Sequence, residues 1–509
     1  MARMTRRRFL AGSAAMAAGA FVLSTPSHRV LGANEDIRVA ILGLNGQGGS
    51  HLMTHRDIAG ARIVALCDPD KAVLERAVKH LATVPADPDN PEKSKEKARK
   101  LQEKHANVAT YTDLRRVYDR KDVDAVVIAA PNHWHSLATI WAVQAGKDVY
   151  VEKPLSHDIF EGRKVVEAAA KYNRIVYVGT QSRSDEGLAE AFEWLKAGNL
   201  GKPLRARGFC YKPRGSIGKT EGPQPIPGTV DYDLWCGPAP KDPLRRKKLH
   251  YEWHWFWATG NADIGNQGIH EMDKCRWGIG ATIVKRAMGF GGRFGYEDDA
   301  ETPNTETVFL ETDTVPIIFE VRGLPVRKAT AEEKNPAIDA YGKAGVRVGE
   351  VFDFEGGYFA GGWAVDSKGE KVKQFKRDGG AKHRDNFLKA LRSRKPEDNP
   401  AQAIEGHRSA ICFHVGNISY RLGKETKREE VAEMFKTDKV AQECWERFQT
   451  HVSANEADPS KWQPTVGPWL TFDPQAEKFT GAFADKANVL TKGTRDGKYR
   501  EPFVVPEKV

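Results

Sequence analysis

The sequence predicts an α/β protein in which a domain with a parallel sheet precedes an α+β domain with a large, mostly antiparallel open sheet. Two observations favour this fold class. Across residues 37–180, short β-branched runs alternate with longer amphipathic ones, which is typical of stacked βαβ units. After Thr180 this alternation stops, and a Gly/Pro-rich, aromatic stretch at 211–260 precedes extended segments. That change predicts an antiparallel sheet with helices on one face.

The predicted elements follow from these patterns. Residues 85–105, dense in Lys and Glu, are expected to form a solvated insertion with a charged helix. The remaining predictions are strands at 38–42, 62–67, 124–129, 148–151, 175–178, 307–311 and 316–321, and helices at 384–394 and 405–422.

A chain of 509 residues exceeds what one hydrophobic core usually supports, so several segments are expected. We predict a signal peptide at 1–33, a first domain at 34–180, a second domain at 181–422 and a tail extension at 423–509. The tail is expected to wrap the surface or a neighbouring subunit.

The N-terminus carries an Arg6-Arg7 pair before a weakly hydrophobic run at 9–23, which is too short to span a bilayer comfortably. This pattern predicts a twin-arginine export signal, and a basic anchor helix is the alternative. The mature protein is therefore expected to be periplasmic or otherwise exported, to meet the twin-arginine translocase during export, and to have no stable membrane insertion afterwards.

Net charge and cysteine spacing argue against several classes of protein. Cleavage after residue 33 removes five arginines and lowers the formal net charge from +10 to +5, so nucleic-acid binding has little electrostatic support. The six cysteines form no C-x-x-C pair, which argues against a zinc ribbon or a dense disulfide framework, although one or two bridges stay possible in an oxidising compartment.

A glycine-rich loop directly follows the first predicted strand, and Asp68 ends the second. Such a loop lets backbone N–H groups approach a pyrophosphate, as in a Rossmann domain. The carboxylate can accept hydrogen bonds from the ribose hydroxyls. Asn45 replaces the middle glycine of the motif; asparagine tolerates left-handed backbone, but its side chain takes up room. Asp68 favours NAD over NADP, and an empty Rossmann fold is the alternative. The predicted cofactor contacts here are Gly43, Asn45, Gly46, Gln47, Gly48 and Asp68.

Two further motifs lie at carboxyl ends of predicted strands, Pro131-Asn132-His133-Trp134-His135 and Glu152-Lys153-Pro154. With them the chain resembles the glucose-fructose oxidoreductase and inositol dehydrogenase family, Gfo/Idh/MocA, from about residue 37 to 422. The resemblance implies that Lys153 lies beside the nicotinamide and the substrate hydroxyl, where a cation stabilises developing alkoxide charge. It also implies cofactor contacts for Pro131, Asn132, His135 and Glu152. No metal is expected, because His133 and His135 have no cluster of further ligands.

Residues 260–270 resemble the second signature of the family, in which an aspartate and a histidine four residues later face the lysine. His270 is present, but Asn266 occupies the aspartate position, and Asp263 is the candidate substitute. The expected catalytic group is therefore Lys153, His270, Asp263 and Asn266.

Substrate contacts are predicted less directly. Trp253, Trp255 and Trp257 alternate, so an extended segment would place their indoles on one side, where Trp255 and Trp257 could stack on a sugar ring. Core packing is the slightly preferred alternative. Arg183 is expected on the cleft side by resemblance, and His407 is either a substrate contact or structural.

These observations predict an oxidoreductase that transfers hydride between a sugar or polyol secondary hydroxyl and a tightly bound nicotinamide, NAD or less favourably NADP. One alternative is a redox-neutral NAD-dependent glycoside hydrolase, in which transient oxidation permits elimination. Another is a noncatalytic sugar-binding protein, which Asn45 and Asn266 favour. The resemblance also implies a homodimer or homotetramer associated through the open face of the second sheet.

Overall fold

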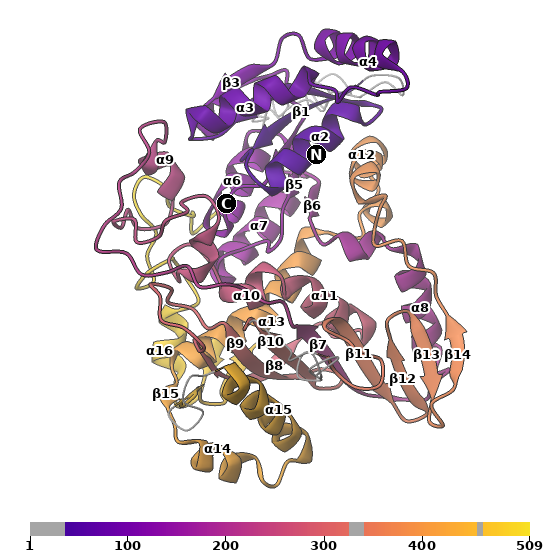
Figure 1. The fold of residues 1–509 in the computed structure, drawn as a ribbon, viewed down its shortest axis with the longest axis vertical. Coiled ribbons are helices and arrows are strands. Elements are labelled where there is room, and N and C mark those ends of the chain that lie inside the picture. The colour runs from indigo at the N-terminus through magenta and orange to yellow at the C-terminus, as the bar shows by residue number, and fades with distance from the viewer. Residues whose placement is uncertain (1–35, 325–339, 456–461) are drawn as a thin grey trace, which may run out of the picture. The chain divides into compact units, whose positions relative to one another are not determined.

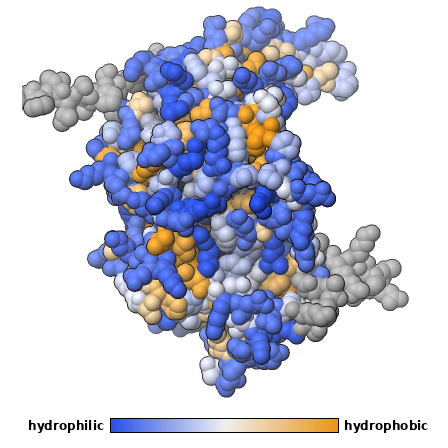
Figure 2. Space-filling model, turned by 90° about the vertical axis from the view of Figure 1, so that its left-hand side faces the viewer, coloured by the Kyte–Doolittle hydropathy of each residue, from blue (hydrophilic) through white to orange (hydrophobic). Residues whose placement is uncertain are grey.

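The computed structural model describes residues 36–324, 340–455 and 462–509, so the predicted signal peptide lies outside the described residues. Within those ranges, no helix combines the length and the apolar character needed to cross a bilayer. On the face shown in Figure 2, hydrophilic residues predominate and apolar residues form several separate patches.

The first domain is built on a six-stranded sheet whose neighbouring strands all run parallel, in the order β3-β2-β1-β4-β5-β6. The five predicted strands are confirmed, and only the three-residue β3 was not predicted. The charged insertion contains the mostly exposed helix α4, as expected. The elements are β1 Ile37–Leu42, α2 Gln47–Asp57, β2 Ala61–Cys67, α3 Lys71–Ala82, α4 Pro91–Lys104, β3 Ala109–Tyr111, α5 Leu114–Tyr118, β4 Ala125–Ile128, α6 Asn132–Gln144, β5 Asp148–Val151, α7 Ile159–Lys171 and β6 Val176–Val178.

The second domain contains a twelve-stranded sheet with the main order β14-β13-β12-β11-β7-β10-β9-β8-β16-β15. It is mostly antiparallel, as predicted, because among its described strands only β10 and β7 pair in parallel. Its strands are β7 Pro203–Cys210, β8 Val284–Gly292, β9 Thr305–Thr312, β10 Ile317–Arg322, β11 Val348–Phe354, β12 Gly357–Ala360, β13 Trp363–Asp366, β14 Lys371–Gln374, β15 Lys424–Glu425, β16 Thr465–Val466, β17 Leu470–Asp473 and β18 Lys478–Thr480.

Helices cover both faces of this sheet at β8 to β10, whereas the sequence predicted one face (Figure 1). In β9, Val308 and Leu310 pack in the core formed with α11 and α13, and the alternate residue Phe309 packs against α14 and α15. The remaining helices are η2 Gln181–Ser184, α8 Glu186–Lys196, α9 Tyr232–Cys236, η3 Glu252–Trp255, α10 Ala262–Asn266, α11 Ile269–Gly278, α12 His383–Ser393, η5 Pro396–Asp398, α13 Ala403–Arg421, α14 Arg428–Phe435, α15 Lys439–Asn455 and α16 Ala484–Val489.

The tail after residue 422 is more integrated than the sequence predicted. Its strands β16 and β17 both pair with β8 and so extend the large sheet. Its last part returns to the first domain, where Tyr499, Phe503 and Val505 join the hydrophobic core. The Tyr499 hydroxyl donates to Oδ2 of Asp158 at 2.8 Å. The tail therefore completes both sheet domains of its own chain.

Replacement of Phe448 tests the role of α15 in stability. Phe448 is almost fully buried, with its ring centroid 5.1 Å from that of Phe290 on β8. Phe448→Ala should lower the free energy of unfolding by about 3–5 kcal/mol, measured by chemical denaturation, because it leaves a cavity. The control Met434→Ala, at an exposed position on α14, should change it little. Equal effects of the two substitutions would contradict the packing described here.

Candidate active site

A cavity of about 530 Å³ lies at the carboxyl ends of β1, β2, β4 and β5 and is bounded on its other side by α10 and α11. Open α/β sheets bind their ligands at this edge, and the volume lies within the usual range for small-molecule sites. We call this cavity the main cleft. Predicted site residues that line it are Gly43, Asn45, Gly46, Gln47, Asp68, Pro131, Asn132, His135, Glu152, Lys153, Asn266 and His270.

The glycine-rich loop connects β1 to α2 and packs closely against the backbone that follows β4. Gly43 has φ +79°, and a Cβ there would lie 2.7 Å from the backbone nitrogen of Ala130. Gly46 supplies a second left-handed residue, with φ +52°, directly before α2. Asn45 is not among the described residues with positive φ. The tolerance of asparagine for left-handed backbone is therefore not needed, because the neighbouring glycine adopts that conformation.

Asp68 follows β2 and is held by two backbone N–H groups. Its Oδ2 accepts from Leu44 N and its Oδ1 from Asp70 N, both at 2.9 Å. Burial raises the pKa of the carboxyl above its usual value, although these two bonds oppose the rise. A carboxylate offers about four lone-pair sites, so each oxygen keeps capacity for a ligand hydroxyl.

Lys153 joins the two domains across the main cleft. Its Nζ donates to the backbone oxygen of Asn266 at 2.9 Å. Burial lowers the pKa of the ammonium below its usual value, while the charges of Glu152 and Asp263 oppose that shift. Lys153 forms no ion pair with any carboxylate of the described residues.

Behind Lys153, three side chains form a hydrogen-bonded chain that the sequence did not reveal. Arg384 Nε donates to His51 Nδ1 at 3.3 Å, so the His51 proton lies on Nε2, which is 2.8 Å from Glu152 Oε1. Burial alone would raise the pKa of Glu152, but the His51 hydrogen bond and nearby positive charges lower it overall. Glu152 is therefore held as a carboxylate. Gly179 makes room for it, since a Cβ there would lie 2.9 Å from Glu152 Oε2.

Asn266 and His270 both line the main cleft, although α10 ends between them at Asn266 and α11 begins at Ile269. Burial first, and then the charge of Lys153, lower the pKa of His270 to about 3. Its ring is therefore neutral near pH 7. The imidazole makes no hydrogen bond to another side chain or backbone group in the described part of the chain, which leaves it available to a ligand.

Asp263 does not take the place expected of a carboxylate in the cleft. It is fully buried, accepts from Arg214 Nη2 at 2.9 Å and Nε at 3.0 Å, and is not among the lining residues. Burial would raise its pKa, but the Arg214 contacts lower it overall. Its Oδ1 also accepts from Asn266 Nδ2 at 3.1 Å. Asp263 thus positions Asn266 and is not placed to act as a base on a ligand.

In the first turn of α6, which follows β4, the two histidines differ in position. His135 lines the main cleft, with its ring nitrogens 2.6 and 2.7 Å from the carbonyl oxygens of Pro154 and Ala130. His133 is fully buried against backbone carbonyl groups. Among the residues that the structure describes, no group of three or more His, Cys, Asp or Glu side chains is arranged to hold a metal ion.

The prediction of an extended tryptophan segment is wrong. Residues 252–255 form the 3-10 helix η3, so the three indoles do not share one side. Trp253 lines the main cleft, whereas Trp255 is only 2% exposed and packs under the Arg293 guanidinium at 4.7 Å. Trp257 contacts Arg421 at 5.1 Å and does not line the cleft. Packing therefore accounts for Trp255 and Trp257.

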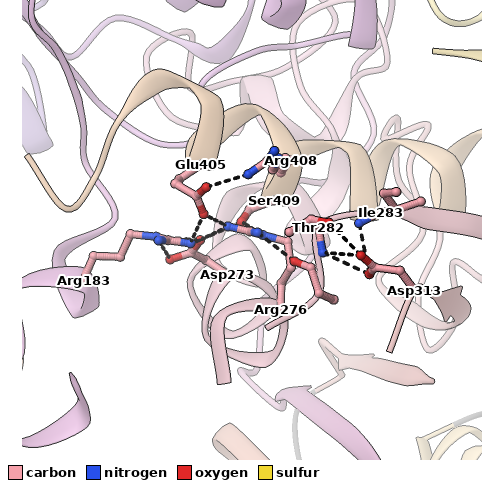
Figure 3. A network of polar contacts seen from close by, with 10 residues as sticks. Arg183, Asp273, Arg276, Thr282, Ile283, Asp313, Glu405, Arg408 and Ser409 are labelled. Atoms are coloured by element: carbon pink, nitrogen blue, oxygen red, sulfur yellow. Dashed lines mark hydrogen bonds and ion pairs between the residues drawn. The ribbon is translucent and has the colours of Figure 1, made fainter. Parts of the chain in front are cut away.

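Arg183 and His407 lie in ion pairs away from the cleft lining, in contrast to the predicted substrate contacts. Arg183 Nη2 pairs with Asp273 at 2.7 Å and with Glu405 at 3.1 Å, and Arg276 joins the same carboxylates (Figure 3). His407 Nε2 lies 2.8 Å from Glu477 Oε1. The arginine pairs hold η2, α11 and α13 together, and the His407 pair joins α13 to the tail, so these contacts are structural.

Several lining residues were missed because they belong to no recognisable motif. Arg384 comes from α12, and Tyr251 and Gln267 from irregular segments, so only the folded chain brings them to the cleft. The additional lining residues with polar or aromatic side chains are Thr112, Asp113, Trp134, Gln181, Trp235, His250, Tyr251, Trp253, Gln267 and Arg384.

Comparison with known proteins agrees with this geometry. Residues 37–180 match the model of the Gfo/Idh/MocA oxidoreductase family with an NAD-binding Rossmann fold, and residues 192–282 match the C-terminal alpha/beta domain of an oxidoreductase family with the same name. The matched segments are a nucleotide-binding domain and a following α/β domain, each described for an oxidoreductase family. Residues 37–180 therefore form an NAD-binding Rossmann domain of the Gfo/Idh/MocA oxidoreductase type.

Individual relatives cover less of the chain. An inositol 2-dehydrogenase 4 of Saccharopolyspora erythraea is 35% identical over 173 residues, which is 34% of this chain and 44% of that protein. An alpha-N-acetylgalactosaminidase of Shewanella oneidensis is 29% identical over 141 residues, 27% of each protein. The chain thus aligns with less than half the length of these relatives. The WlbA dehydrogenase structure from Bordetella pertussis, 16% identical with a TM-score of 0.52, covers 76% of this chain and 97% of its own and supports the fold.

Adjacent glycines in α2 provide a matched test of the loop. A Cβ at Gly48 would lie 1.9 Å from the Gly43 carbonyl oxygen, whereas one at Gly49 would meet its nearest atom at 3.5 Å. Gly48→Ala should displace the loop and weaken NAD binding by about tenfold or more, a loss of about 1.4 kcal/mol. Gly49→Ala should bind NAD normally. Equilibrium dialysis with labelled NAD measures both, and unchanged binding by Gly48→Ala would contradict the role of this turn.

Proposed function

We propose that the protein is an NAD-dependent oxidoreductase that moves hydride between a secondary hydroxyl of a sugar or polyol and a tightly held nicotinamide. The observation that carries this proposal is the position of Lys153. Its amine lies in the same cleft as the glycine-rich loop and Asp68, and it is anchored to the second domain through the Asn266 carbonyl.

The residues present fit a dinucleotide. Gly43, Gly46 and Gln47 line the cleft at the start of α2, where a helix N-terminus favours phosphate. Asp68 would accept hydrogen bonds from ribose hydroxyls and would repel a 2′-phosphate, which favours NAD over NADP. Pro131, Asn132, His135 and Glu152 line the neighbouring wall.

When bound, the nicotinamide supplies a hydride acceptor at its C4 atom. Lys153 takes the hydroxyl proton of the alcohol as the C–H bond breaks, and its lowered pKa makes the neutral amine accessible. The neutral imidazole of His270 hydrogen-bonds the same hydroxyl or its neighbour. Asn266, held by Asp263, orients the substrate through its side chain. In the reverse direction Lys153 returns the proton to the product alkoxide.

Contacts between the domains support tight cofactor retention. Residues 69–71 pair with residues 229–231 through Asp231 N to Pro69 O at 2.9 Å and Lys71 N to Thr229 O at 3.0 Å. His250 adds a contact to Asp70 at 2.9 Å. Pro69 and His250 line the main cleft, so these bonds hold the second domain against the part of the cleft where Asp68 lies and would slow the exit of a bound dinucleotide. Retention suits the proposed export, because free nucleotide is scarce outside the cytoplasm. Association as a dimer or tetramer is part of the same proposal.

A second candidate function is redox-neutral glycoside cleavage, in which the nicotinamide is reduced and reoxidised within one cycle. The alignment with an alpha-N-acetylgalactosaminidase favours it. Steady hydrolysis of a glycoside by pure protein without added nucleotide would support it over net oxidation. The noncatalytic alternative loses support, because Asn45 needs no left-handed backbone and Asn266 holds Lys153 through its carbonyl group.

Lys153→Ala should strongly reduce turnover and leave the cofactor bound. Removal of the proton acceptor should lower kcat by about 10²–10⁴-fold. Denaturation of the purified variant should still release NAD in the wild-type amount, measured by chromatography. The exposed control Lys202→Ala should retain both properties. Wild-type turnover by Lys153→Ala would refute the central assignment.

The pH profile tests the electrostatic influence of Glu152. Oxidation of an alcohol needs the unprotonated Lys153 amine, so kcat/KM rises as the pH passes the lysine pKa. The negative charge of Glu152 raises this pKa, and Glu152→Gln should therefore lower it. The rising limb of kcat/KM should therefore move to lower pH. A shift in the opposite direction would show that another group controls this limb.

A further inference from the structure

A second cavity of about 360 Å³ lies beside α9 and shares Trp235 with the main cleft. Nothing in the proposed hydride transfer uses it. Its walls combine guanidinium groups, carboxylates and aromatic rings from four separate segments. The lining residues that carry the argument are Tyr232, Trp235, Arg245, Arg246 and Phe256.

Arg246 is the unusual group in this cavity, because it is 4% exposed and has no ion pair with any carboxylate of the described residues. Its guanidinium lies over the rings of Trp235 and Phe256, at 5.0 and 5.3 Å. Nη2 donates to the Leu249 carbonyl at 3.0 Å, but Nε is buried without a hydrogen-bond partner. Burial lowers the pKa of Arg246 to about 10, which still leaves the group charged at neutral pH. A buried cation without a counter-charge is costly.

Three carboxylates also line this cavity, but none of these described side chains lies within ion-pair distance of Arg246. Asp242 accepts from Arg495 Nη1 at 3.0 Å, and Asp299 accepts from the Thr220 backbone N–H at 2.7 Å. Glu301 accepts from the backbone N–H of Trp257 at 2.9 Å. Arg245, at the exposed rim, has no ion pair within the described ranges either. The cavity therefore holds two guanidinium groups with unused donor capacity.

The aromatic residues restrict the kind of anion that fits. Tyr232 and Phe256 are half-buried, so each ring keeps some accessible surface. Tyr232 stacks on Trp235 with centroids 5.9 Å apart, which fixes the ring orientation. Rigid aromatic faces suit the apolar face of a sugar ring, while a guanidinium suits a carboxylate through paired hydrogen bonds.

We propose that this cavity is an accessory binding site for a carboxylate-bearing sugar of the uronic acid type. The carboxylate pairs with Arg246 and Arg245, and the sugar ring lies against Phe256. The ligand would supply the counter-charge that the folded chain withholds from Arg246. This site is separate from the proposed hydride transfer and stands whether or not Lys153 acts as proposed.

Isothermal titration calorimetry of the full chain with its bound cofactor tests the proposal, with D-glucuronate as the probe. D-Glucose serves as the neutral comparison and inorganic phosphate as the anion without a ring. We expect D-glucuronate to bind, and Arg246→Gln to weaken it by about tenfold or more. Arg245→Gln, at an exposed position that does not threaten folding, should weaken it by a smaller factor. The control Arg62→Gln, an exposed arginine on β2, should bind as the wild type does.

Three results would overturn the proposal. Failure of D-glucuronate to bind would refute the site. Binding that is unchanged in both Arg246→Gln and Arg245→Gln would place the ligand elsewhere, including the main cleft. Equal affinity for D-glucose or inorganic phosphate would refute the ligand class. Loss of activity in Lys153→Ala with retained D-glucuronate binding would agree with both proposals and keep them distinct.

Discussion

The hydrogen bond from Lys153 Nζ to the Asn266 carbonyl fixes the geometry on which the proposed chemistry depends. Two carboxylates lie near this ammonium, and each is hydrogen-bonded to a partner of its own. Glu152 is held by His51, and Asp263 by Arg214. The negative charges of Glu152 and Asp263 therefore act on the Lys153 amine, although neither carboxylate forms an ion pair with it. The two carboxylates stabilise the protonated lysine, while burial lowers its pKa and makes release of the proton easier.

The same junction is stiffened by the arginine network of Figure 3. Arg183 and Arg276 both reach Asp273 and Glu405, so η2, α11 and α13 share one set of buried charges. Removal of one member would leave others buried without compensation. Because α11 also carries His270, the network fixes the position of this histidine relative to Lys153. These buried charged residues thus stabilise the helices around the main cleft although they do not line it.

The sequence was sufficient for the parallel sheet and the cofactor motifs, because those features depend on local pattern. Strong β-branched runs predicted β1 and β5, and the motifs containing Gly43 and Lys153 follow strands directly. The failures concern long-range contacts. A tryptophan alternation predicted an extended segment where η3 forms, and nothing in the spacing reveals that Arg183 meets Asp273. His51 and Arg384 are 333 residues apart, so no local pattern could place them together.

The return of the tail to the first domain also bears on the order of events during biosynthesis. Tyr499 bonds to Asp158 across 341 positions of sequence, and Phe503 and Val505 fill the same hydrophobic core. The whole nucleotide-binding domain is therefore synthesised before the tail residues that complete its hydrophobic core. Such distant contacts slow folding and leave apolar surface open in the nascent chain. The first domain can complete its hydrophobic core only after residues 499–505 have been synthesised, and a fragment that ends after β6 would lack these side chains.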